Sequence, residues 1–428
     1  MDLKSWYKKR GPEFVWYRGM RLLGRYRIGS NRAIQRIKEC VESLVEMGCA
    51  PTLFTPGMVV DRNPQFIQNL QQLGAEIAVH SYHHVNLSEM PVSFATQQLM
   101  RAIRSFEHFG IEKRGFRCPY LAYSDELLNS LPCGMFDYSS NEALLWDVVD
   151  HNDLSHKGIF FDALEKFYKG RNASESVCLP SMRSNMVEIP ICVPDDLQLH
   201  DGLFLNDEDI KQVWARFLEQ TYSRGELFNL IFHTELASCV DDSFVELLNR
   251  ARQLRPMVWI TRLRDISDWW REKPKFGVEI TSNAKGLKLT FDCSPRATIL
   301  VRGLHSPESG LMWDGTYSRW KSNTLEVPAN PRPFIGLADG IPERIISFLH
   351  EQGYILDTGE TARFCGLILD NDILTKLPND VELVNYIEAS PVPLVRYWRW
   401  PNGAKSALSI TGDMDALSLM DYASRLFI

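Results

Sequence analysis

The chain has 428 residues, 45% of them hydrophobic, so it can form two or three domains with substantial cores. Its net charge of −7 argues against a dedicated nucleic-acid-binding protein. The chain has no apolar run long enough for a transmembrane helix, and its first ten residues lack the apolar core of a signal peptide. Nine cysteines without CxxC spacing suit reduced thiols, so we predict a cytoplasmic protein.

Residues 1–29 are rich in basic and aromatic side chains. The simpler interpretation is a solvated segment packed by its aromatic rings. The alternative is a surface that contacts an anionic membrane peripherally, or a phosphate-bearing substrate. Both interpretations stay open at this point.

Helices and strands are predicted to alternate from residue 31 to about residue 270. Helical spacing of apolar residues predicts helices over 31–47, 64–73, 92–109, 207–223 and 241–254. Apolar runs predict strands at 52–54, 76–80, 115–120, 134–140, 187–193, 228–233 and 257–260. This alternation predicts an α/β fold with a parallel sheet or barrel.

The pattern changes after residue 275. Residues 276–330 alternate with period two between turn residues, which predicts a small antiparallel β unit. Residues 334–390 return to α/β character, with a helix over 342–352 and an apolar run at 364–369. A strand over 407–411 and a helix over 417–427 are predicted to end the chain.

The stretch around residue 80 is the first candidate for chemistry. A predicted strand ends at His80, and His84 follows four positions later. If the chain turned into helix there, both imidazoles would lie on one face and could bind one divalent ion, with a third ligand from elsewhere. Such pairs also arise by chance, so the spacing alone is a weak signal.

Three motifs in order strengthen the signal: His80-Ser81-x-x-His84, Arg117-x-Pro119-Tyr120 and Leu230-x-x-His233. With these motifs the chain resembles the NodB-type polysaccharide deacetylase family, metal-dependent enzymes that hydrolyse N- or O-acetyl groups on sugars. The resemblance covers residues 30–265. It implies a distorted (β/α) barrel with its site at the carboxyl ends of the strands.

The family begins with an acidic motif on its first strand, and no such motif precedes residue 50 here. Two candidates lie downstream. Asp292, in the segment 289–293, lacks a second acid and lies in the predicted β unit. The segment 410–415 has a strand, both Asp413 and Asp415, and a following helix, and it resembles the D-x-D variant of the family. We favour the second candidate.

This choice predicts a circularly permuted barrel. We expect Ala407–Thr411 to run parallel to the strand at residue 52, which would bring Asp413 and Asp415 close to the two histidines. The predicted organisation is the main part of the barrel at 1–274, a β module at 275–332, a small α/β module at 333–395 and the permuted strand and helix at 396–428.

The resemblance implies a role for each candidate residue. Asp415, His80 and His84 would bind one divalent ion, and we predict zinc from the nitrogen and oxygen ligands. Asp413 would be the general base, Arg117 would hold it ionised and oriented, and His233 would be the general acid. The backbone N–H of Tyr120 would help to hold the oxyanion.

Each role has a plainer alternative. His233 could be a core histidine, and Arg117 an ordinary surface ion pair. We expect His83 to point away from the metal ligands. Asp195 and Asp196 have the pattern of loop-turn aspartates, although a substrate contact is open. Four more residues would lie where the family shapes its substrate pocket, namely Tyr138, Ser139, Ser140 and Trp146.

The predicted function is a metal-dependent deacetylase acting on an N-acetylated sugar or a similar acetamido compound. An intracellular location would indicate a nucleotide- or lipid-linked precursor in glycan biosynthesis. One alternative is a hydrolase of a cyclic imide or ureide on the same scaffold. Another is a catalytically inactive glycan-binding or assembly protein that kept the histidines and lost the acids. No oligomeric state is indicated.

Overall fold

The computed structural model describes residues 29–149, 157–183, 185–284, 286–304 and 312–424. The expectation for the basic N-terminal segment therefore falls almost entirely outside the described residues. Among the described helices, none is both long and apolar enough to cross a membrane.

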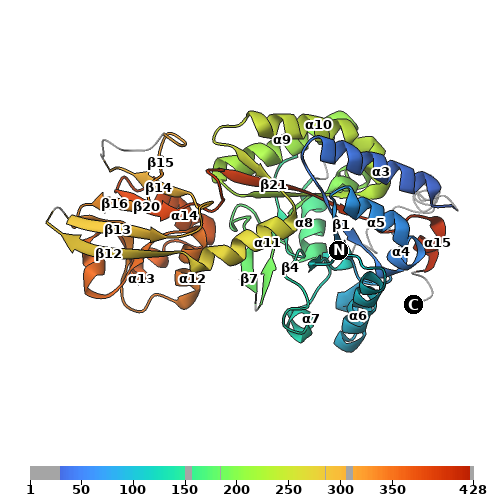
Figure 1. The fold of residues 1–428 in the computed structure, drawn as a ribbon, viewed down its shortest axis with the longest axis horizontal. Helices are drawn as coiled ribbons and strands as arrows, with labels where there is room; N and C mark the ends of the chain where they lie inside the picture. The colour runs from blue at the N-terminus through green and yellow to red at the C-terminus, as the bar shows by residue number, and fades with distance from the viewer. Residues whose placement is uncertain (1–28, 150–156, 184, 285, 305–311, 425–428) are drawn as a thin grey trace.

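A curved sheet of nine strands forms the main body (Figure 1). All neighbours are parallel except the last pair, which is antiparallel. Strand β11 (Val258–Ile260) pairs with β21 beside the main path. The order along the path is β10 (Leu227–His233), β21 (Ser406–Asp413), β1 (Thr52–Thr55), β2 (Glu76–Val79), β3 (Gly115–Phe116), β4 (Tyr138–Ser139), β8 (Met186–Glu188) and β7 (Ser181–Arg183).

Amphipathic helices pack against this sheet. Every residue of β1, β2, β10 and β21 is buried, as expected for parallel strands covered on both faces. Helices α3, α9 and α10 lie side by side along one margin of the body (Figure 1). The helices of this part are α3 (Asn31–Glu46), α4 (Gly57–Arg62), α5 (Pro64–Gln72), α6 (Val92–His108), α7 (Asp125–Ser130), α8 (Lys157–Tyr168), α9 (Asp207–Arg224), α10 (Ala237–Gln253) and α11 (Leu263–Glu272). The predicted α/β class and distorted barrel are confirmed.

The C-terminal strand lies in the middle of the main sheet. β21 is parallel to β10 on one side and to β1 on the other, as expected for Ala407–Thr411. Asp413, its last residue, is in register with Phe54 of β1 and with His233 of β10. The carboxyl end of β21 therefore meets the ends of the strands that carry the histidines. That this strand arose by permutation stays a prediction.

One expected strand is wrong. Residues 187–193 form two strands, β8 and β9 (Ile191–Val193), which belong to different sheets. Pro190 separates them, because proline has no N–H to continue a ladder. Its carbonyl instead accepts a hydrogen bond from Asn229 Nδ2 at 2.9 Å. Strand β9 pairs in parallel with β5 (Ala143–Leu145), and β5 pairs with β6 (Arg171–Asn172).

Residues 276–397 form a side lobe of three small sheets (Figure 1). Two are antiparallel: β12 (Gly277–Asn283) with β13 (Gly286–Asp292) and β16 (Thr324–Val327), and β14 (Ile299–Arg302) with β15 (Ser318–Trp320) and β20 (Leu394–Tyr397). The third is parallel and holds β17 (Arg332–Leu337), β18 (Leu356–Asp357) and β19 (Cys365–Leu369). Helices α12 (Glu343–Gln352), α13 (Asn371–Leu374) and α14 (Asp380–Ala389) complete the lobe.

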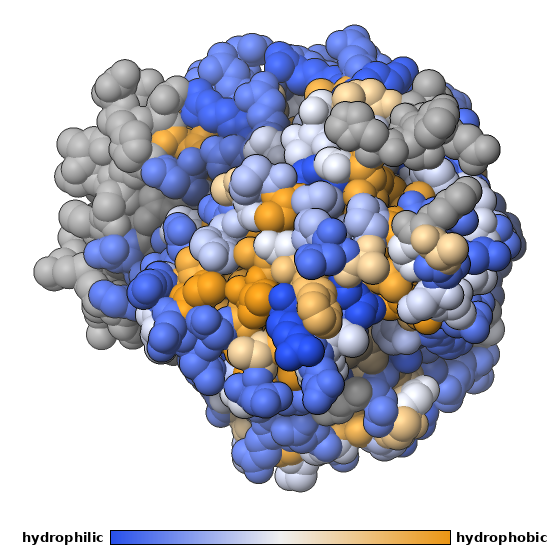
Figure 2. Space-filling model, turned by 90° about the vertical axis from the view of Figure 1, so that its left-hand side faces the viewer, coloured by the Kyte–Doolittle hydropathy of each residue, from blue (hydrophilic) through white to orange (hydrophobic). Residues whose placement is uncertain are grey.

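Strand β20 sets the C-terminal boundary of the side lobe. It returns to pair with β14, so the two predicted modules are interlocked. We therefore propose one lobe that ends after Tyr397 instead of two modules divided at residue 332. The segment that follows the lobe is joined to the main body through buried tryptophans: Trp269 Nε1 donates to Arg399 O at 2.7 Å, and Trp400 Nε1 donates to Gly225 O at 2.9 Å. Figure 2 shows the far end of the lobe, where groups of hydrophobic residues lie among hydrophilic ones.

Candidate active site

His80 follows β2 and is completely buried. Its Nδ1 lies 2.9 Å from Arg117 O, and because a carbonyl only accepts, Nδ1 carries the proton. The lone pair of the neutral ring is therefore on Nε2. No described residue forms a hydrogen bond with Nε2, whose nearest carboxylate oxygens are Asp415 Oδ1 at 3.6 Å and Asp413 Oδ2 at 3.7 Å. A buried lone pair facing carboxylates is a metal-ligand environment.

His84 and Asp415 complete a group of three. His84 Nε2 lies 2.8 Å from Asp415 Oδ1, and the rings of His80 and His84 have centroids 4.8 Å apart. The ligand atoms of the three residues all lie within 4.8 Å of one another. Atoms bound about 2.0–2.1 Å from one tetrahedral zinc ion would be about 3.4 Å apart. The three residues therefore fit one divalent ion.

The loop that carries the histidines is not helical, so the expected helical face is wrong. Ser81 has φ 62° and His84 has φ 53°, both in the left-handed region. These two residues turn the chain sharply after β2 and bring His84 back beside His80. Strained backbone of this kind persists where the surrounding structure fixes it, and it is common at functional sites.

Asp413 is held by a buried arginine. Arg117 Nη1 donates to Asp413 Oδ1 at 2.6 Å, and Arg117 Nη2 donates to Thr411 Oγ1 and Ser140 Oγ, each at 3.1 Å. The guanidinium also stacks on the Phe54 ring, 3.9 Å from its centroid. Arg117 is fully buried, so the surface ion-pair interpretation is wrong. An ion pair in this setting fixes the direction of the carboxylate.

His233 ends β10 and is bound by Asp196. The backbone N–H of His233 donates to Asp196 Oδ2 at 2.7 Å, and its Nδ1 lies 2.7 Å from Asp196 Oδ1. Burial alone would lower the pKa of His233, but the carboxylates of Asp196, Asp195 and Asp415 raise it well above the ordinary value. The direction of this shift favours the protonated ring, and Nε2 is directed away from Asp196.

Asp195 is a second buried acid beside this histidine. Burial raises its pKa to about 7, although the nearby His233 acts in the opposite direction. Its backbone is fixed by Gln198, which exchanges two hydrogen bonds of 2.8 Å with it. The sequence interpretation of both acids as loop-turn residues therefore missed the partner of His233. The available signal was their position directly after the buried strand β9.

Tyr120 borders the histidines from the loop after β3. It has φ 60°, its ring centroid lies 4.9 Å from that of His84, and it is 43% exposed. The preceding segment is pinned by Asn141, whose Oδ1 accepts from Cys118 N at 2.7 Å. The ring of Tyr120 therefore forms part of the accessible edge of the site.

Other candidates lie outside this cluster. Asp292 ends β13 in the antiparallel sheet of the side lobe. His83 points toward Arg101, with 3.3 Å between His83 Nε2 and Arg101 Nη1. Tyr138 and Trp146 are buried in the core, so they do not line a substrate pocket. Ser139 is buried against Glu188, and Ser140 bonds to Arg117.

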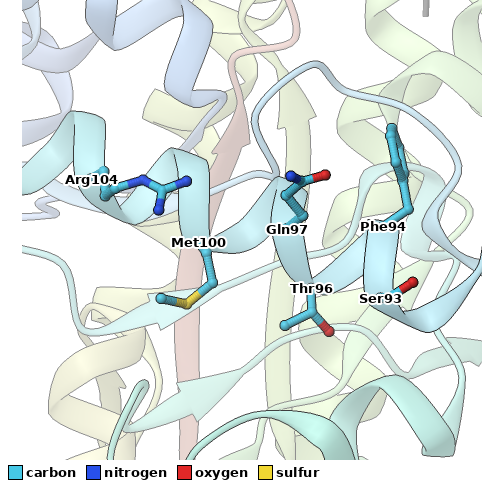
Figure 3. A pocket seen from close by; sticks show the side chains of 6 residues that line it. All are labelled: Ser93, Phe94, Thr96, Gln97, Met100 and Arg104. Atoms are coloured by element: carbon cyan, nitrogen blue, oxygen red, sulfur yellow. The ribbon is translucent and has the colours of Figure 1, made fainter.

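A pocket of about 540 Å³ lies along helix α6 (Figure 3). Its lining residues all come from this helix and are Ser93, Phe94, Thr96, Gln97, Met100 and Arg104. None of them belongs to the cluster of histidines and carboxylates. The pocket is therefore separate from the candidate active site.

Comparisons with known proteins give a family match over part of the chain and distant similarities to solved structures. The polysaccharide deacetylase family model matches residues 34–132. A putative polysaccharide deacetylase from Mycobacterium smegmatis is 18% identical, with TM-score 0.42, over 56% of this chain and 77% of that one. The peptidoglycan deacetylase PdaC from Bacillus subtilis is 17% identical, with TM-score 0.33, over 57% and 88%. An allantoinase, Puue, is 16% identical, with TM-score 0.41, over 56% and 72%. No curated protein matches the chain significantly.

The fold and the site define an α/β barrel protein with a candidate metal centre at the carboxyl ends of its strands. Residues 34–132, which contain both histidines and Arg117, match the polysaccharide deacetylase family model.

Proposed function

We propose that the protein is a metal-dependent deacetylase that hydrolyses the acetamido group of an N-acetylated sugar. The coarser statement, a hydrolase acting on amide bonds, rests on the polysaccharide deacetylase domain. The observation that carries the finer one is the convergence of three groups at one end of the sheet. These are the ligand set with Asp415, the Arg117–Asp413 pair and the Asp196–His233 pair.

The ligand set would supply the electrophilic chemistry. His80, His84 and Asp415 would hold a divalent ion, which would supply Lewis-acid chemistry by polarising an amide carbonyl and lowering the pKa of water to about 7. His80 is prepared for this role because Arg117 O fixes its tautomer. Zinc fits the two nitrogen donors and one oxygen donor.

The remaining residues would move the protons. Asp413, oriented by Arg117, accepts the proton of the attacking water. His233 is kept protonated by its carboxylate neighbours and donates a proton to the leaving amine. The backbone N–H of Tyr120 would add a donor for the oxyanion. Asp413 and Asp415 lie beside His80, which argues against the inactive binding protein.

A substrate screen tests the proposal. Purified protein loaded with zinc is incubated with N-acetylated monosaccharides, nucleotide-linked N-acetyl sugars, chitin oligomers and a cyclic ureide. Acetate release and ureide opening are measured separately. Acetate release that is lost in Asp413→Asn supports the proposal. Ureide opening without acetate release would contradict it and would favour the other hydrolase, whereas no turnover of any compound would favour a binding protein.

The Asp196–His233 pair makes the pH profile a specific prediction. In Asp196→Asn the largest source of the raised pKa of His233 is removed, so that pKa falls. A general acid must be protonated, so activity is lost as the pH rises through its pKa. The alkaline limb of kcat should therefore move to lower pH in this variant, measured as acetate release between pH 5 and 10. Asp201→Asn, in the same loop, serves as the control, and an unmoved limb in Asp196→Asn would contradict the assignment.

A further inference from the structure

Helix α4 lies between the two segments that carry the proposed metal ligands, which come from distant parts of the chain. At its start, Gly57 N donates to Ser81 O at 3.0 Å and Met58 N donates to Tyr82 O at 3.1 Å. The first turn of the helix thus holds two carbonyls of the loop between His80 and His84. This loop contains left-handed backbone, so it depends on such external contacts to keep its shape.

The close approach of α4 to this loop requires its glycine. A Cβ atom on Gly57 would lie 2.7 Å from Ala102 Cα and 2.7 Å from Tyr82 Cδ2. The next contact comes from Asp61, whose Oδ2 accepts from Tyr82 OH at 2.7 Å. The guanidinium of Arg101 stacks on the face of the Tyr82 ring, 3.7 Å from its centroid. The histidine loop is therefore fixed by α4 and α6 together.

The last residue of α4 contacts the acidic segment. Arg62 Nη1 donates to Asp421 Oδ1, and the side chain of Asp421 is 3% exposed, whereas that of Arg62 is 45% exposed. The second oxygen of Asp421 accepts from Leu417 N at 3.1 Å, Ser418 N at 3.0 Å and Ser418 Oγ at 2.9 Å. Asp421 thus fixes the turn that directly follows Asp415.

The other side of the same turn is anchored on the sheet. Met414 N donates to Phe54 O at 2.9 Å, and Met414 is completely buried. Asp415 therefore lies between an anchor on β1 and the turn fixed by Asp421. The Arg62–Asp421 pair differs from the anchor on β1 in one respect. Arg62 is part of α4, the helix that also holds the histidine loop.

We propose that the Arg62–Asp421 ion pair is a positioning device that sets Asp415 at the correct distance from His80 and His84. The inference rests on the proposed metal site. Loss of Arg62 removes an ion pair from a buried carboxylate and so weakens the support of the turn that carries Asp415. The ligand set becomes less preorganised for the ion, while the fold of the sheet is retained.

The test compares Arg62→Ala with Arg62→Lys, Asp421→Asn and Arg250→Ala. Arg250 is the matched control, since its side chain is 51% exposed and pairs with Glu246 on α10 at 2.7 Å. Zinc affinity is measured by competition with a chromophoric chelator, coordination geometry by the absorption spectrum of bound Co²⁺, and stability by thermal unfolding. We expect Arg62→Ala and Asp421→Asn to bind zinc about 10-fold more weakly or worse, with an altered Co²⁺ spectrum. Arg62→Lys should recover part of the affinity, and Arg250→Ala should match the wild type.

Two outcomes would overturn the inference alone. One is an Arg62→Ala protein with the zinc affinity and Co²⁺ spectrum of the wild type. The other is a lowered Tm in Arg62→Ala with unchanged affinity and spectrum, which would show a purely structural ion pair. If the wild type itself binds no divalent ion, the proposed function fails and the inference falls with it.

Discussion

Replacing His80 and His84 together by alanine is expected to remove the bound metal and to reduce amide hydrolysis to background. The ligand atoms of the two imidazoles and of Asp415 lie within 4.8 Å of one another. Without the imidazoles, the single remaining carboxylate would hold zinc poorly. Loss of the ion removes on the order of several kcal/mol of transition-state stabilisation. Metal content after dialysis, measured by elemental analysis against protein concentration, should fall from one equivalent to none.

His83→Ala is the control for this change. His83 lies between the two ligands in sequence, but its ring faces Arg101. The single variant should therefore keep its metal and most of its activity. One equivalent of tightly bound metal in the double alanine variant would show that the ion binds elsewhere.

His233→Ala is expected to lower kcat by about 10²–10⁴ while the metal content stays at one equivalent. His233 is bound to Asp196 at the end of β10, where neighbouring carboxylates raise its pKa, and it does not belong to the ligand group of His80. The His233→Ala substitution removes the proton donor but leaves the metal ligands in place. Steady-state acetate release and elemental analysis on the same preparation measure both quantities.

His200→Ala provides a matched comparison, because His200 lies in the neighbouring segment and its Nδ1 lies 3.2 Å from Asp201 Oδ1. We expect near wild-type kcat for this variant. If His233→Ala lost its metal instead of only its activity, His233 would be a ligand and its role as general acid would be wrong.

The parts of the site that the sequence predicts are those set by strand ends. His80, Arg117, His233 and Asp413 each end or follow a parallel strand, and such ends meet at one edge of a sheet. The motifs identify the strands, and the topology then brings the residues together. For the same reason the pairing of β21 with β1 could be expected from a missing first strand.

The parts that depend on loop geometry could not be predicted. Ser81 and His84 adopt left-handed backbone although neither is glycine or asparagine, the residues that usually indicate it. The sequence therefore does not indicate that a turn is present where a helix is expected. Asp196 differs from an ordinary loop aspartate by its contact with His233, a residue that is 37 positions away in the sequence. The pairing of β20 with β14 joins segments far apart in the sequence, and no local pattern specifies it.

The central claim is that the C-terminal strand completes the metal centre, and zinc affinity of Asp415→Ala tests it most directly. Asp292→Ala, which alters the other acidic candidate in the side lobe, is measured beside it. Competition with a chromophoric chelator should show greatly weakened binding for Asp415→Ala and wild-type binding for Asp292→Ala. Wild-type affinity in Asp415→Ala would contradict the claim, because the histidines would then draw their third ligand from another part of the chain.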